Sequence, residues 1–290
     1  MLKVEEQRAP AQETTSPPPQ TVSRWSGAAR EQAVQRMFTA IARWYDLNNT
    51  VLSFGLHHRW KRHVLDLVMP PEAGDCGVRS GNTSRTPFGQ DLTAKEASGG
   101  AEPRYILDIG AGTADLALLI ESRLQPDGRV IAADLNHAML VEGQRKVERK
   151  GLRSRITCME VNAEHLSFPD GSFDAVTTGF CMRNVGDLQL ALQEIQRVLK
   201  PGGRFVCLEF SHPDRAWLRR LYDWYSFTLL PKVGTMVAHD TTGVYEYLPA
   251  SIRTFPDQET LCERLRQAGF RDVTYRNLTG GIVAIHSAVK

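Results

Sequence analysis

The sequence predicts an α/β protein built on a mostly parallel sheet. From residue 104 onward, short and often β-branched apolar runs alternate with stretches whose apolar residues recur at helical spacing. Such alternation is typical of a parallel sheet with helices on both faces. Near the end of the chain, two strand-like runs flank Thr279-Gly280-Gly281 and predict an antiparallel hairpin that closes the sheet.

The expected elements can be placed in order along the chain. Helices are expected over residues 31–68, before the first strand. The expected strands are 105–109, 130–134, 156–161, 175–179 and 205–210, and the helices between them are 116–124, 138–150 and 188–199. Pro201-Gly202-Gly203 is expected to end the last of these helices and to turn the chain into the fifth strand. The last expected elements are a helix over 258–268 and hairpin strands at 273–278 and 282–288.

The composition is that of an ordinary globular protein. The chain has 290 residues, of which 42% are hydrophobic and 23% charged, and its formal net charge is +2. These values exclude a collagen, a wholly disordered chain and a disulfide scaffold. Because the charge is nearly balanced, no global field favours nucleic acid, and we expect no nucleic-acid partner.

Two segments are poor in large apolar residues. Residues 1–30 carry Pro17-Pro18-Pro19 among polar residues, and residues 71–103 are rich in Gly, Pro, Ser and Thr. Neither segment can bury enough apolar area to offset its ordering entropy. We therefore expect a disordered N-terminal segment at 1–30 and one domain at 31–290, interrupted by a flexible insert at 71–103.

No targeting or metal-binding pattern is recognised. The N-terminus lacks the apolar core of a secretory signal, and its glutamates argue against a mitochondrial transit peptide. No apolar run reaches the length of a membrane span. The five cysteines form no CxxC pair, so neither structural zinc nor a disulfide framework is expected. We expect a cytoplasmic protein without a metal.

A glycine-rich turn follows the first expected strand. Gly110 and Gly112 open the next helix, but Asp115 stands where a dinucleotide-binding turn has its third glycine, and Asp108 lies two residues before Gly110. A pyrophosphate at this helix N-terminus would meet carboxylates. S-adenosylmethionine (SAM), which carries an ammonium and a sulfonium, suits the site better.

The next two strands end in groups that suit the same ligand. Asp134 ends the second strand, where nucleotide-binding α/β proteins place an acid on the ribose hydroxyls. Asn162 and Ala163, followed by Glu164, lie after the third strand, where they could cover an adenine edge. The alternative interpretation makes Asp108 and Asp115 helix caps and Asp134 a turn residue.

Further motifs are spread over roughly residues 33–290, apart from 71–103. They include Ser53-Phe54-Gly55-Leu56-His57, Arg183-Asn184-Val185, Lys200-Pro201-Gly202-Gly203, Leu208-Glu209-Phe210-Ser211 and Asn277-Leu278-Thr279-Gly280-Gly281-Ile282-Val283-Ala284. In these motifs the chain resembles the ubiquinone/menaquinone biosynthesis C-methyltransferase family. The resemblance implies a seven-stranded Rossmann-like fold, SAM as methyl donor and a polyprenylated quinol whose ring carbon is methylated.

The resemblance also implies roles for individual residues. SAM would be bound at Thr113, Asp134, Asn162 and Ala163, and the RN motif places Arg183 and Asn184 beside the sulfonium. The chain departs from the family pattern with Ala111 and Ala114 in the glycine-rich turn, with Gly179 after the fourth strand, and with Cys181 and Met182 before the RN motif.

Three residues are candidates for the chemistry. A ring carbon is a weak nucleophile unless its neighbouring oxygen loses a proton, so the substrate must be a reduced quinol. Arg183, always cationic, is a poor base and is expected to stabilise the developing phenolate or to orient a water. Asn184 is expected to hydrogen-bond a ring oxygen, and Tyr45 to contact cofactor or quinol from above. The alternative for Arg183 is a structural ion pair.

The histidines and the aromatic residues allow more than one interpretation. A surface or capping role is favoured for His57 and His58 and a structural role for His286, whereas His212 and Asp240 stay open as site residues. The aromatic segment 214–247 is either core or an apolar lid for a prenyl tail.

A prenyl tail implies substrate collection at a membrane. We therefore expect peripheral contact with its inner face. A homodimer and a quinone-synthesis complex are left open as assemblies. The competing functions are SAM-dependent methylation of another small molecule and a non-catalytic partner in quinone synthesis.

Overall fold

The computed structural model describes residues 28–69, 104–229 and 244–290. The first helix begins at Ala28, within the last residues of the segment expected to be disordered. The rest of that segment, the expected insert at 71–103 and Asp240 lie outside the described residues. Within the described ranges, no helix is long and apolar enough to cross a bilayer.

Seven strands form one sheet in the order β3-β2-β1-β4-β5-β7-β6. Their bounds are β1 Tyr105–Ile109, β2 Arg129–Asp134, β3 Ile156–Glu160, β4 Phe173–Gly179, β5 Leu199–Phe210, β6 Arg271–Leu278 and β7 Val283–Val289. The first five strands pair in parallel, whereas β7 runs antiparallel to both β5 and β6. The predicted fold class is confirmed, and so is the closing hairpin, whose turn is the 3-10 helix η6 (Thr279–Gly281).

The fifth strand begins earlier than expected. The helix before it ends at Val198, and β5 starts at the next residue rather than after the glycines. Phe173 pairs with Leu199 and Ala175 with Arg204, so the Pro201-Gly202-Gly203 stretch bulges out of the ladder. Proline has no N–H to give to a neighbouring strand, and a bulge accommodates it.

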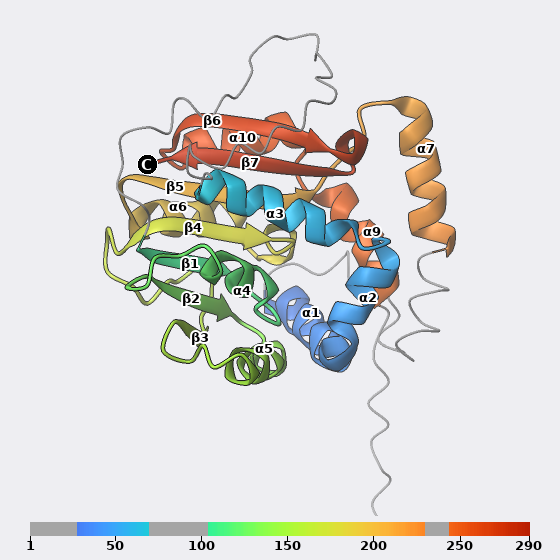
Figure 1. The fold of residues 1–290 in the computed structure, drawn as a ribbon. Coiled ribbons are helices and arrows are strands. Elements are labelled where there is room, and N and C mark those ends of the chain that lie inside the picture. The colour runs from blue at the N-terminus through green and yellow to red at the C-terminus, as the bar shows by residue number, and fades with distance from the viewer. Residues whose placement is uncertain (1–27, 70–103, 230–243) are drawn as a thin grey trace, which may run out of the picture.

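Helices cover both faces of the sheet (Figure 1). On one face, α3 (Leu56–Val68), α4 (Asp115–Glu121) and α5 (His137–Arg149) share a buried apolar cluster with the strands. On the other face, α6 (Leu188–Val198) and α10 (Gln258–Gln267) pack in a second cluster with Leu107 and Phe205. These contacts bury the apolar positions that predicted the helices, because strands covered on both faces need apolar partners on each.

A cap lies over the carboxyl ends of the parallel strands (Figure 1). It comprises α1 (Ala28–Ile41), η2 (Ala42–Trp44), α2 (Tyr45–Leu52), α7 (Ala216–Trp224), the π-helix η5 (Tyr225–Leu229) and α9 (Val244–Thr254). A third apolar cluster joins Met37 and Ile41 of α1 to Tyr247 of α9. Segments far apart in the sequence thus meet above the edge of the sheet where α/β proteins bind their ligands.

Candidate active site

The turn after β1 is held in a conformation that only small residues allow. Gly110 has a φ of +65° and Gly112 a φ of +54°. A Cβ atom at Gly110 would overlap the Sγ atom of Cys181. Glycine is therefore required at this position for both its backbone angle and its close approach. Ala114, which is fully buried, is the N-cap of α4 with a φ of +63°.

Asp134 ties this turn to the end of β2. Its Oδ2 accepts the N–H of Gly112 at 2.8 Å, and its Oδ1 accepts the N–H of Asn136 at 2.7 Å. Burial raises the pKa of the carboxyl, although these N–H groups oppose the shift. Asp134 is therefore a turn residue, as the alternative interpretation held, and it also lines a cavity.

Two cavities meet at the glycine-rich turn. The smaller, of about 90 Å³, is lined by Gly110, Gly112, Asp134, Asn162, Ala163 and Asn184 among others. The larger, of about 420 Å³, extends from the same glycines past Asp108, Thr113 and Arg183 into the cap. Tyr45 lines both cavities. The structure thus brings the residues predicted to bind the cofactor or to carry the chemistry to one place, while the contacts of each with a ligand stay predictions.

Asp108 lines the larger cavity with a buried carboxyl group. Its side chain is buried, and its Oδ1 accepts the hydroxyl hydrogen of Thr177 at 2.8 Å. Its Oδ2 has no hydrogen bond of ordinary geometry among the described residues. Burial raises the pKa of this carboxyl to about 7. A buried oxygen without a partner fits an ammonium such as that of SAM, which would hydrogen-bond it and favour its ionised form.

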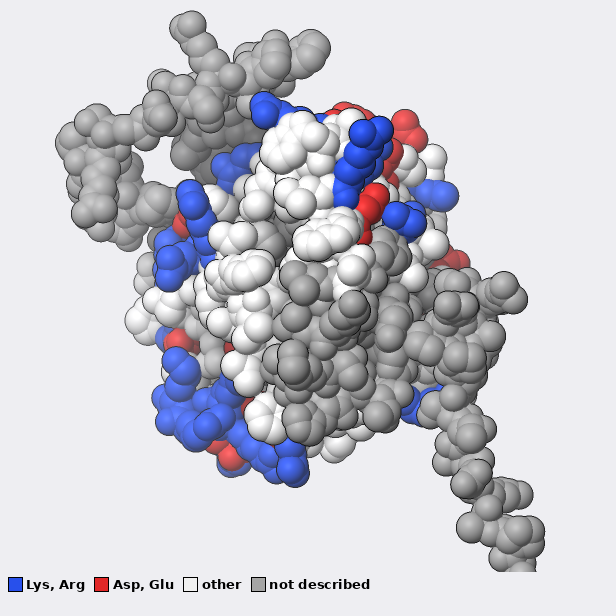
Figure 2. Space-filling model, turned by 90° about the vertical axis from the view of Figure 1, so that its right-hand side faces the viewer, with Lys and Arg blue, Asp and Glu red and all other residues white. Residues whose placement is uncertain are grey.

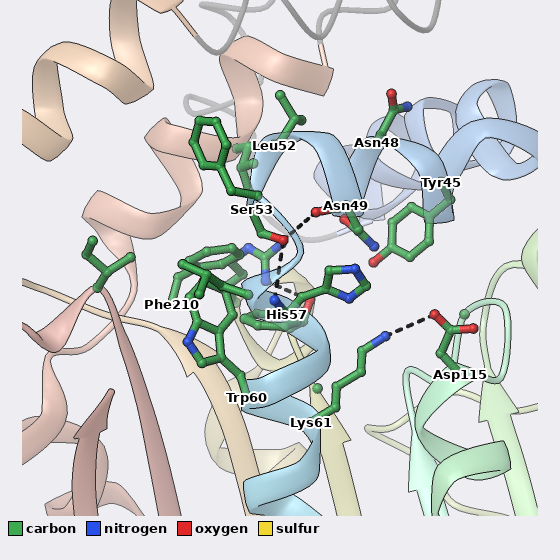
Figure 3. A pocket seen from close by; sticks show the side chains of 18 of the residues that line it. Tyr45, Asn48, Asn49, Leu52, Ser53, His57, Trp60, Lys61, Asp115 and Phe210 are labelled. Atoms are coloured by element: carbon green, nitrogen blue, oxygen red, sulfur yellow. Dashed lines mark hydrogen bonds and ion pairs between the residues drawn. The ribbon is translucent and has the colours of Figure 1, made fainter. Parts of the chain in front are cut away.

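Asp115 does not carry the uncompensated charge that we expected. Its carboxylate lies 2.7 Å from Lys146 Nζ. It also lies 3.2 Å from Lys61 Nζ, and Figure 3 shows this second pair. Burial tends to raise the pKa of Asp115, but the two lysines outweigh burial and lower it. The electrostatic argument against a pyrophosphate was therefore wrong for Asp115 and rests on Asp108 alone.

Thr113 belongs to the same polar network. Its hydroxyl donates to Asp46 Oδ1 at 2.6 Å and accepts from Lys146 Nζ at 2.9 Å. Lys146 also pairs with Asp46. Because Asp46 lies on α2, this network fastens the cap to the start of α4.

Arg183 forms the ion pair that the alternative interpretation described. Its Nη1 lies 2.6 Å from Glu209 Oε1, and both side chains are buried. The same nitrogen donates to the carbonyl oxygen of Phe180 at 2.6 Å. Burial tends to lower the pKa of Arg183, but Glu209 outweighs burial and raises it. Arg183 also lines the larger cavity, so pairing does not remove it from the site.

Asn184 lines only the smaller of the two cavities, whereas Tyr45 lines both. Asn184 accepts the hydroxyl hydrogen of Tyr247 at 3.0 Å and lines the smaller cavity, not the larger. This position favours contact with the cofactor over contact with a quinol ring. Burial raises the pKa of Tyr45 to about 12, so this phenol stays protonated at neutral pH.

A surface or capping role was expected for His57, and the surface alternative was wrong because the side chain is buried. It is 3% exposed and lines the larger cavity, whereas its neighbour His58 is exposed. No sequence signal separated the two, because only the packing of α3 against the cap decides which side is buried. His286 is buried on β7 with Nε2 3.0 Å from the carbonyl oxygen of Gln258, which confirms a structural role. His212 lines neither cavity.

The aromatic segment contributes both to the core of the cap and to the wall of the larger cavity. Tyr222, Trp224, Tyr225 and Tyr247 line the larger cavity. Tyr247 is buried in the cap, whereas Trp217 and Trp224 are exposed to solvent. Core packing and an apolar wall therefore occur in the same segment.

The sheet order, the antiparallel β7 and the glycine-rich turn at β1 together define a SAM-dependent methyltransferase fold. A Thermotoga maritima structure described as a SAM-dependent methyltransferase and possible histamine N-methyltransferase superposes with a TM-score of 0.53. It covers 89% of this chain and 98% of its own, at 15% identity, which shows the fold alone.

The chain belongs to the ubiE/COQ5 methyltransferase family, whose model matches residues 27–80 and 88–290. The match enters both ends of the expected insert and leaves out only 81–87 in its interior. The ubiquinone/menaquinone biosynthesis C-methyltransferase of Idiomarina loihiensis is 40% identical over 90% of this chain and 92% of its own. The enzyme of the same name from Edwardsiella ictaluri is 42% identical over 91% of this chain and 93% of the relative's chain. The chain is thus a SAM-dependent C-methyltransferase.

Proposed function

We propose that this enzyme methylates a ring carbon of a reduced, polyprenylated quinol in menaquinone or ubiquinone biosynthesis. The observation that carries the proposal is the larger cavity of about 420 Å³, which runs from the cofactor turn into an aromatic cap. A flat ring fits between aromatic walls, and a prenyl tail needs an apolar path out of the site. The relatives named above act in the same biosynthesis by name.

The chain's own residues bind SAM and the quinol, align them with each other and exclude water from the site. SAM supplies an electrophilic methyl group when bound. We assign its ammonium to Asp108, its ribose hydroxyls to Asp134, and its adenine to Asn162 and Ala163. Tyr45, at the junction of the two cavities, would align the ring with the methyl group. Alignment and exclusion of water supply much of the rate enhancement in such displacements.

A methyl-transfer assay tests this proposal. We expect the purified protein, given SAM and chemically reduced demethylmenaquinol or the methoxy-polyprenyl-benzoquinol, to transfer one methyl group to the ring carbon of at least one of them. The oxidised quinones serve as the matched control and are expected to stay unmethylated, because they have no phenolic oxygen to donate electrons. SAM binding without methylation of either quinol would contradict the proposal.

The mouth of the larger cavity is surrounded by exposed apolar side chains. α7 contains no buried residue, and its Trp217, Leu221 and Trp224 are between 52% and 61% exposed. Phe54, in the turn between α2 and α3, is 80% exposed. Leu221, Trp224 and Phe54 also line the cavity. Figure 2 shows this face of the molecule, with uncharged side chains across its described centre and Lys and Arg gathered toward its lower left edge.

We assign this patch to the inner face of the membrane, in the cytoplasm. Trp and Leu side chains insert at the headgroup boundary of a bilayer. The exposed arginines at the start of α7 and within it (Arg215, Arg219 and Arg220) would meet anionic headgroups. The prenyl tail of a quinol could then pass from lipid to cavity without crossing water.

Vesicle flotation tests this assignment. Replacing Trp217, Leu221 and Trp224 by serine removes about 1 kcal/mol of interfacial burial each, so binding to phosphatidylglycerol vesicles should fall about 100-fold. Tyr105→Ser is the matched control, because Tyr105 is 49% exposed at the opposite end of β1. Equal flotation of wild type and triple variant would contradict a membrane role for the patch.

A further inference from the structure

His57 is the only histidine in the described wall of the larger cavity, and nothing in the chemistry above uses it. It lies in the first turn of α3, where its backbone N–H faces Ser53 Oγ at 3.3 Å (Figure 3). Its Nε2 lies 3.1 Å from Thr50 Oγ1. The imidazole is therefore anchored at one nitrogen of a residue that lines the cavity, and its other nitrogen, Nδ1, has no hydrogen-bond partner among the described residues.

The hydrogen bonds determine which nitrogen carries the proton. A hydroxyl has one hydrogen, and that of Thr50 is donated to the carbonyl oxygen of Asp46 at 2.8 Å. The contact between Thr50 and His57 therefore needs its hydrogen on Nε2. A neutral imidazole has only one N–H hydrogen, so the other nitrogen, Nδ1, carries a free lone pair. In the described part of the chain, this Nδ1 is buried without a hydrogen-bond partner.

The surroundings keep the ring neutral. Burial lowers the pKa of His57 to about 4, and Lys61 and His58 act in the same direction. Asp115 and Asp46 oppose the shift without overcoming it. The positive end of the α3 dipole adds to the preference for the neutral form. At neutral pH the lone pair on Nδ1 is therefore available.

The other titratable side chains of the described cavity wall are occupied. Arg183 and Lys61 are paired with Glu209 and Asp115. Tyr45 and Tyr222 stay protonated, because burial raises the pKa of each to about 12. Tyr225 and Tyr247 donate their hydroxyl hydrogens to the carbonyl oxygen of Leu52 and to Asn184. Asp108 lies at the cofactor turn, where its free oxygen suits the ammonium.

We propose that Nδ1 of His57 accepts the phenolic proton of the quinol while the neighbouring ring carbon is methylated. This inference rests on the proposed function and identifies the general base for it. The O–H bond breaks with its proton on Nδ1, and the oxygen's electron pair forms a C=O bond. The ring π pair forms the bond to the methyl carbon, and the methyl–sulfur pair leaves with sulfur. The ring hydrogen then departs to water, and the proton on Nδ1 returns to the oxygen to restore the quinol.

The charge balance favours this route despite the weak basicity of His57. One positive charge leaves the sulfonium as one appears on the imidazole, so the net charge of the site does not change. Asp115 and Asp46 act electrostatically in favour of the protonated ring and so stabilise the positive charge that appears on it.

A pH profile of single-turnover methyl transfer tests the proposal. We expect a nearly flat wild-type rate between pH 6 and 9, because His57 is neutral throughout. His57→Gln keeps a donor for Thr50 but loses Nδ1, so we expect about 100-fold slower transfer at pH 7. Its rate should rise about tenfold per pH unit, because only quinol ionised in solution reacts. His58→Gln, altering the exposed neighbour, should keep the wild-type profile.

Two measurements separate this role from a structural one. SAM affinity and melting temperature of His57→Gln should match wild type. In ¹⁵N NMR, wild-type His57 should carry hydrogen on Nε2 only, and quinol should shift the Nδ1 signal. A flat His57→Gln profile at a near wild-type rate, or hydrogen on Nδ1, would overturn the role of His57 while leaving the quinol assay positive. A negative quinol assay with wild type would overturn both proposals.

Discussion

Asp108→Asn is expected to weaken SAM binding ten- to hundredfold at pH 8 and, at the same pH, to stabilise the ligand-free protein. The Asn side chain still accepts the Thr177 hydroxyl hydrogen, as Asp108 does at 2.8 Å. It cannot offer a charged oxygen to an ammonium, and a hydrogen bond to a charged group is worth about 1.5–3 kcal/mol. Titration calorimetry at pH 6 and pH 8 measures the loss, and wild-type affinity should rise across pH 7 as the carboxyl ionises.

The gain in stability follows from the pKa of the same carboxyl. Its folded value of about 7 lies above the unfolded value of about 3.9, because burial disfavours the charged form. The folded state thus binds the proton more tightly, and wild-type stability falls as pH rises from about 4 through 7. Three pKa units correspond to about 4 kcal/mol as an upper bound. Asp108→Asn removes this loss, so its melting temperature should exceed that of wild type at pH 8.

An exposed aspartate provides the matched control for Asp108→Asn. Asp127→Asn changes the same group at an exposed position, where the side chain is 61% accessible, and should alter neither property. An Asp108→Asn protein that binds SAM as well as wild type would show that this carboxyl does not face the cofactor, and one that melts below wild type at pH 8 would contradict the raised pKa.

Glu209→Gln and Arg183→Met are each expected to destabilise the protein by about 3–5 kcal/mol. The ion pair has side chains only 5% and 1% exposed, and removing either partner leaves an uncompensated buried charge. Glu209 also accepts the backbone N–H of Arg183 at 3.3 Å and of Phe210 at 2.9 Å. Urea unfolding of the single variants measures the effect.

The double variant separates structure from catalysis. Arg183→Met with Glu209→Gln leaves no buried charge, so much of the stability should return, and the coupling free energy is read from the double-mutant cycle. If Arg183 also stabilises the developing phenolate, methyl transfer stays slow although the protein is folded. The exposed pair Arg123–Asp66 is the matched control and should contribute at most about 1 kcal/mol. Equal losses in both pairs would contradict the burial argument.

Local patterns predicted the sheet well because each strand and helix carries its own periodicity. The parallel strands matched within a few residues, except where Leu199 and the Pro201–Gly203 bulge extend β5 toward the preceding helix. The glycine-rich turn was also readable, since a positive φ at Gly110 and Gly112 leaves a direct mark on the sequence. The carboxyl ends of parallel strands share one edge, so Asp108, Asp134 and Asn162 could be grouped before any contact was known.

By itself, the sequence determined the fold class, the cofactor turn and the family, because these depend on spacing along the chain. Charge partners depend on packing between distant segments, and only the tertiary structure decided them. Lys61 and Lys146 neutralise Asp115 from two other helices, and Glu209 on β5 pairs with Arg183. The burial of His57 beside the exposed His58 follows from the way α3 packs against the cap. Short-range periodicity carries no information about which charged side chains pair across the fold. These pairs between distant segments determine the electrostatics of the site.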